Sequence, residues 1–97
     1  MDRERIIATL QRHAVDLKQL GASRLFLFGS VARGDAGPSS DVDLFFDFED
    51  AGFSLVELVA LRQRISELVQ APVDLMSRAS IHPRLRAGIE GAALQVF

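Results

Sequence analysis

The sequence contains no cysteine, which excludes disulfide scaffolds and thiolate metal sites. It also has no basic excess: 11 Lys and Arg against 13 Asp and Glu give a net charge of −2, which argues against direct nucleic-acid binding. No apolar run approaches the roughly 18 residues that span a bilayer. The N-terminus, MDRER, lacks the apolar core of a signal peptide. We therefore expect a cytoplasmic protein with no membrane contact.

The hydrophobic pattern of the 97 residues predicts one small domain over residues 1–97. Apolar residues at helical spacing predict a helix over 2–20, and a capping box at Ser54 with Glu57 begins another that stops before Pro72. Strands are predicted at 24–28, 41–48 and 73–76, then a short helix from Pro83 to about 89 and a closing strand within 93–97. This order predicts an α/β (α+β) fold, a small mixed sheet of three to four strands with helices packed on one side.

Three aspartates stand out because each lies on a predicted strand among apolar residues. Asp41 and Asp43 are two apart, so both side chains project from one face, about 6–7 Å apart along the chain. Asp74 joins them if the second and third strands are neighbours, and three carboxylates can hold the divalent cations of a phosphoryl-transfer site. The alternative is a solvated acidic face for Asp41 and Asp43, and an exposed edge position for Asp74. Phe45 shares this face, where it could stack on a base.

The Gly29-Ser30 pair stands where a buried strand gives way to a turn or helix start. Glycine lets the backbone approach a ligand, and the following amides with the Ser30 hydroxyl can bind phosphate. Arg33 is near enough in sequence to assist. The alternatives are a helix cap for Ser30 and, for Arg33, a structural ion pair with Asp35 or Asp41.

The segments GSVARG at 29–34, SDVDL at 40–44 and VDL at 73–75 resemble the minimal nucleotidyltransferase (MNT) family of the DNA polymerase beta-like nucleotidyltransferase superfamily. The resemblance covers nearly the whole chain and matches in spacing, residue type and order. It implies that Gly29 and Ser30 hold a triphosphate. It also implies that Asp41, Asp43 and Asp74 bind two Mg²⁺ ions, with Asp74 helping to activate the attacking hydroxyl.

The same resemblance implies an enzyme that transfers AMP from ATP and releases pyrophosphate. Minimal members commonly pair with a HEPN-domain toxin, whose tyrosine they adenylylate as the antitoxin of a toxin–antitoxin system. Two alternatives are a binding-only antitoxin that neutralises its toxin by complex formation, and a small-molecule nucleotidyltransferase completed by a partner chain. A domain this small also favours association with itself or with a partner.

Overall fold

The computed structural model describes residues 2–97, so Met1 of the expected domain lies outside it. The elements in chain order are α1 (Arg3–Arg12), α2 (Ala14–Gln19), β1 (Arg24–Phe28), α3 (Gly29–Arg33), β2 (Val42–Asp47), α4 (Leu55–Val69), β3 (Val73–Ser77), the 3₁₀ turn η1 (Arg78–Ser80), α5 (Pro83–Ala92) and β4 (Leu94–Gln95). None of the helices in this described part has the length and apolar character that crossing a membrane requires.

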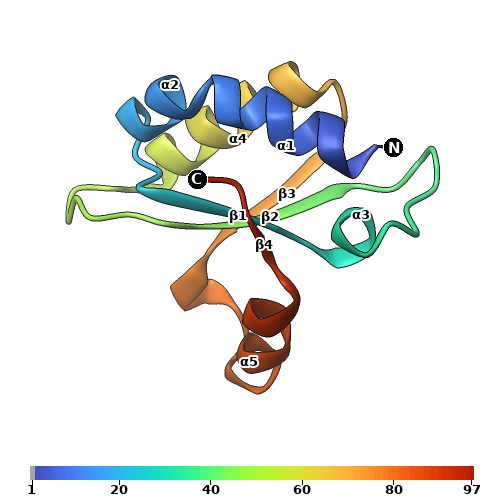
Figure 1. The fold of residues 1–97 in the computed structure, drawn as a ribbon. Coiled ribbons are helices and arrows are strands. Elements are labelled where there is room, and N and C mark those ends of the chain that lie inside the picture. The colour runs from blue at the N-terminus through green and yellow to red at the C-terminus, as the bar shows by residue number, and fades with distance from the viewer. Residues whose placement is uncertain (1) are drawn as a thin grey trace.

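The four strands form one mixed sheet in the order β3-β2-β1-β4 (Figure 1). β1 runs antiparallel to both of its neighbours, and β2 runs parallel to β3 through the crossover helix α4. This confirms the expected small mixed sheet. It also makes β2 and β3 neighbours, which the grouping of the three aspartates requires.

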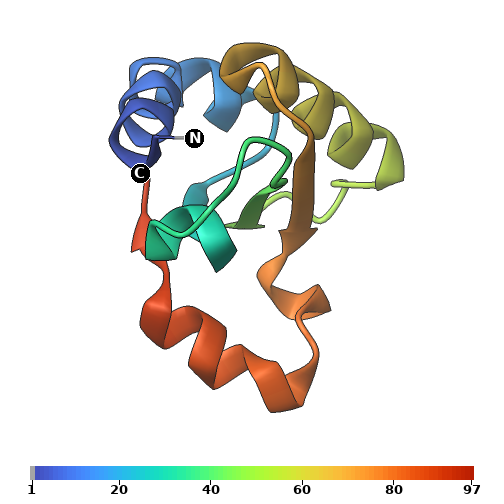
Figure 2. The same cartoon turned by 90° about the vertical axis from the view of Figure 1, so that its right-hand side faces the viewer.

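Helices α1, α2 and α4 cover one face of the sheet, and α5 lies on the opposite side (Figures 1 and 2). The core lies under the three helices because alternate residues of each strand point toward them. It includes Leu25 and Leu27 of β1, Leu44 and Phe46 of β2, Leu10 of α1, Leu17 of α2, and Leu61 and Ile65 of α4. The alternate positions of β1 and β2 point to the other face, which carries the aspartates.

The expected helix over 2–20 is divided at His13 into α1 and α2. The His13 amide donates to the carbonyl of Leu10, three residues back, instead of that of Thr9. The Thr9 carbonyl instead accepts from Nδ1 of the His13 ring, at 2.9 Å. A side chain that replaces the backbone amide as donor interrupts the helical ladder, which the apolar periodicity does not reveal.

Several predicted boundaries also shift, and β2 begins at Val42 and ends at Asp47, so Asp41 and Phe48 of the predicted strand lie just outside it. The last helix extends to Ala92, three residues beyond the expected end, and the closing strand is only Leu94–Gln95. The capping box is present as predicted: the Ser54 amide donates to the Glu57 carboxylate at 2.9 Å, at the start of α4.

Candidate active site

The aspartates of β2 and β3 lie side by side on the sheet face opposite the helical layer. Asp43 and Asp74 are register partners across the parallel pair, so their side chains leave the same face of strands about 4.8 Å apart. Asp41 immediately precedes β2 and is exposed, as is Asp74, whereas Asp43 is half-buried. The fold therefore brings Asp43 and Asp74 together, while Asp41, just before β2, is near enough to repel Asp43.

Gly29 lies directly against Asp43. Its backbone is left-handed, with φ of +75°, and a Cβ added there would stand 2.2 Å from Oδ2 of Asp43. The two residues meet because Phe28, the last residue of β1, pairs with Asp43 in the sheet. Only glycine permits this backbone conformation without strain and leaves the space that the carboxylate occupies.

Burial and neighbouring negative charges raise the pKa of Asp43 above its ordinary value. Burial is the largest cause, followed by repulsion from Asp74 and Asp41, while Arg33 acts in the opposite direction. An excess of negative charge around a half-buried carboxylate is relieved by a bound cation or by protonation. The arrangement therefore favours a cation next to Asp43.

Helix α3 carries Ser30 and Arg33 beside these carboxylates. The helix is anchored by buried Val31 and Ala32, and Arg3 donates to the Ala32 carbonyl at 2.6 Å. Its N-cap is Phe28, so Ser30 lies within the first turn and is not the cap.

Arg33 pairs with Asp35 at 3.3 Å, and both side chains are largely exposed. The structural ion pair expected as an alternative is thus present, with Asp35 as the partner. An exposed pair of this kind is weak, so it leaves the guanidinium available to a ligand.

A cleft of about 540 Å³ lies between α5 and the segment where β1 passes into α3. One side of the cleft consists of Phe28, Gly29, Ser30, Arg33 and Asp43. The opposite side consists of Leu85, Gly88, Ile89 and Ala92, all from α5. None of these α5 residues was predicted from the sequence to belong to the site. The sequence does carry a signal for them: these four residues are three, one and three positions apart, a spacing that places them on one face of a helix.

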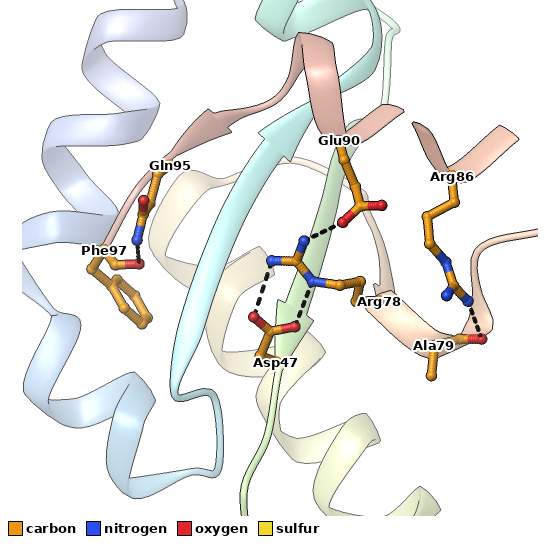
Figure 3. Close-up of polar contacts among 7 residues, drawn as sticks. All are labelled: Asp47, Arg78, Ala79, Arg86, Glu90, Gln95 and Phe97. Atoms are coloured by element: carbon orange, nitrogen blue, oxygen red, sulfur yellow. Dashed lines mark hydrogen bonds and ion pairs between the residues drawn. The ribbon is translucent and has the colours of Figure 1, made fainter. Parts of the chain in front are cut away.

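Arg78 holds α5 in place across the sheet (Figure 3). Its Nε and one terminal nitrogen donate to the two Asp47 oxygens at 2.8 and 3.0 Å, and its other terminal nitrogen pairs with Glu90 of α5. The guanidinium also lies over the rings of Phe26 and Phe45, 4.7 and 5.0 Å from their centroids. The hydrogen bonds to Asp47 and Glu90 raise the Arg78 pKa above its ordinary value.

This contact corrects the expectation for Phe45. Its side chain is 1% exposed, stacked on Phe26 at 4.7 Å and covered by Arg78. Alternation placed Phe45 correctly on the carboxylate face, but it could not show that an arginine from η1 occupies the space above it. Phe45 is therefore not available to stack on a base.

The carboxylates suit a hard divalent cation, although no three His, Cys, Asp or Glu side chains in residues 2–97 are gathered closely enough to enclose one. Mg²⁺ is usually held by one or two carboxylates together with substrate phosphates and water. Asp43 and Asp74 can supply the first part, and the Gly29-Ser30 side of the cleft can receive the phosphates. The donor set therefore fits magnesium with a nucleotide better than magnesium alone.

Sequence comparison finds the nucleotidyltransferase domain over residues 10–94. The chain is 33% identical to protein adenylyltransferase MntA of Thermococcus cleftensis over 93 residues, which is 95% of this chain and 89% of that protein. It is 34% identical to a Methanocaldococcus jannaschii protein, MJ0435, provisionally named a protein adenylyltransferase. That match covers 98% of this chain and 94% of the relative.

Solved structures agree with the fold. A provisionally assigned minimal nucleotidyltransferase superposes with a TM-score of 0.84 at 35% identity, covering 97% of this chain and 95% of that one. A toxin–antitoxin structure with AMP-PNP superposes with a TM-score of 0.72 at 20% identity, covering 90% of this chain and 72% of that one. The structure of the tri-AMPylated Shewanella oneidensis HEPN toxin in complex with MNT antitoxin gives a TM-score of 0.66 at 17% identity. That match covers 94% of this chain and 71% of the other. At these lower identities the two structures are evidence for the fold of this chain alone.

Proposed function

Because the chain belongs to the nucleotidyltransferase domain family, we propose that it is a Mg²⁺-dependent protein adenylyltransferase. It moves AMP from ATP to a tyrosine hydroxyl of a HEPN-domain toxin and thereby acts as the antitoxin. The observation that carries the proposal is the pairing of Asp43 with Asp74 beside the Gly29-lined cleft. The adenylyltransferase names of the relatives support the choice of AMP and of a protein acceptor.

The role we assign to each residue follows from its position in the site. Gly29, Ser30 and Arg33 bind the triphosphate, since all three line the cleft and Arg33 supplies the positive charge there. Asp41 and Asp43 would hold one Mg²⁺ ion, and Asp74 would hold a second. When bound, Mg²⁺ neutralises charge on the phosphates as the reaction proceeds.

Transfer requires the acceptor to lie on the Asp74 side of the nucleotide. The tyrosine oxygen attacks the α-phosphorus, and the bond from that phosphorus to the bridging oxygen breaks, so pyrophosphate leaves. Asp74 accepts the proton of the hydroxyl as the new P–O bond forms. Asp74 suits this role because it is exposed, whereas Asp43 is half-buried against Gly29.

The test is transfer of label from α-³²P-ATP to a HEPN-domain protein encoded beside this chain, with Mg²⁺ present. We expect Asp43→Asn and Asp74→Asn each to reduce transfer about 100-fold or more. Glu49→Gln is the control, because it removes the same charge from an exposed position in the loop after β2. The chain contains no tyrosine, so AMP on a tyrosine must belong to the partner.

Each outcome has a distinct meaning. Label lost in the aspartate variants and on addition of EDTA, but retained in Glu49→Gln, supports the proposed enzyme. A tight complex that neutralises the toxin without any label supports the binding-only antitoxin and contradicts the proposal. Label on a small molecule, and none on the protein, contradicts the choice of acceptor.

A further inference from the structure

The cleft-facing side of α5 is an apolar surface that does not belong to the core. No residue of α5 is buried, and Leu85 is 59% exposed. Leu85, Gly88, Ile89 and Ala92 together line the cleft, and we call them the α5 stripe. The Arg78–Glu90 pair ties the helix to the sheet (Figure 3). An apolar stripe that faces a cleft is available to a ligand.

The position of the cleft relative to the carboxylates indicates which substrate enters it. In the sheet, Asp43 lies between Phe28 on β1 and Asp74 on β3. The cleft lies on the Phe28 side and includes Gly29 and Ser30, whereas the proton acceptor Asp74 lies on the other side. The nucleotide and the acceptor therefore approach Asp43 from opposite directions.

We propose that the α5 stripe receives the nucleoside of the bound triphosphate, with base and ribose packed against Leu85 and Ile89. This rests on the proposed function, since it takes the Gly29-Ser30 wall as the phosphate side of the same cleft. The volume of about 540 Å³ lies within the usual range for small-ligand pockets, roughly 300–1,000 Å³. A polar wall facing an apolar one matches a ligand with charged phosphates at one end and a flat aromatic base at the other.

Two glycines of α5 allow a matched test. A Cβ at Gly88 or at Gly91 would meet nothing within 4 Å, and neither glycine has a positive φ. Gly88 belongs to the stripe, whereas Gly91 is exposed and does not line the cleft. Leucine at either position gains the same helix propensity over glycine, but only the Gly88 substitution fills the space assigned to the nucleoside.

The experiment measures the affinity of the purified chain for ATP and for inorganic tripolyphosphate, both with Mg²⁺, by ligand-induced thermal stabilisation. We expect Gly88→Leu to weaken ATP binding about tenfold or more and to leave tripolyphosphate within twofold of wild type. Gly91→Leu should leave both unchanged. Leu85→Ala is a second variant, which removes apolar contact instead of adding bulk. It should weaken ATP binding by about three- to tenfold and leave tripolyphosphate binding unaffected.

Three results of the binding measurements would overturn the inference. The first is an unchanged affinity for ATP in both stripe variants. The second is an equal loss of affinity for ATP and for tripolyphosphate. The third is no stabilisation of the wild type by ATP at all. The inference and the proposed function can fail separately: ATP binding sensitive to Gly88, in a protein that transfers no AMP, would retain the nucleoside site and reject the enzyme. In the AMP-transfer assay, a higher KM for the acceptor with an unchanged KM for ATP would assign the stripe to the acceptor and contradict the inference.

Discussion

Replacing Gly29 by alanine tests two roles of this glycine: it adopts a left-handed backbone conformation, and it leaves space for the Asp43 carboxylate. Its φ of +75° costs an L-residue about 1 kcal/mol in this conformation. Its missing side chain also leaves room for the Asp43 carboxylate, and a Cβ would stand 2.2 Å from Oδ2. Gly34, at the C-cap of α3, has nearly the same φ of +81°, and a Cβ there meets nothing within 4 Å. Gly34→Ala is therefore the control for backbone strain alone.

The structure sets the expected size of both effects. A loss of about 1 kcal/mol lowers the melting temperature of a domain of this size by roughly 4–8 °C, and both variants should show it. In Gly29→Ala the carboxylate must also retreat by about 1 Å to reach ordinary contact with the new methyl group. A misplacement of about 1 Å in a catalytic group can cost roughly 100-fold in rate. We expect that loss in Gly29→Ala and none in Gly34→Ala.

Thermal unfolding without ligand and initial rates of AMP transfer, at a temperature where both variants are folded, measure the two effects. Equal loss of transfer in both variants would show that backbone strain, and not the displacement of Asp43, is responsible. Full transfer by Gly29→Ala would refute the argument that the approach of Asp43 to Gly29 positions the carboxylate.

Two further predictions concern stability. Arg78→Met should cost about 1–2 kcal/mol in urea denaturation, because it removes two hydrogen bonds to Asp47 from a side chain 30% exposed. Arg33→Met, which breaks an exposed pair, should change stability by less than about 0.5 kcal/mol, and equal losses would contradict the difference in burial. The raised pKa of Asp43 means that its ionisation destabilises the metal-free fold, so stability falls as pH rises above the ordinary value of 3.8 through the raised pKa. Asp43→Asn should thus melt higher than wild type at pH 7 with EDTA, and the gain should vanish below about pH 3.5. A lower melting temperature at pH 7 would contradict the cost of burying the Asp43 charge beside Asp74 and Asp41.

Local patterns in the sequence predicted β1, the central residues of β2 and β3, the capped helix beginning after Ser54, and the core positions of β2. Side chains alternate along a strand whatever lies around it, so Asp43 and Phe45 could be placed on one face from spacing alone. The same reasoning failed at His13, where a ring nitrogen replaces a backbone amide as donor to Thr9. Apolar periodicity carries no information about such side-chain hydrogen bonds.

The sequence by itself determined which residue types stand at these positions: Gly29 and Ser30 directly after a buried strand, Asp43 and Asp74 within two others, and Asp41 just before one of them. Tertiary structure alone decided which of them meet. The parallel pairing of β2 with β3 places Asp74 beside Asp43, and the return of the chain through η1 brings Arg78 over Phe45 and α5 across the cleft. The physical reason is that the direction of a side chain follows from its own backbone, whereas its neighbours depend on the packing of segments far apart in the chain.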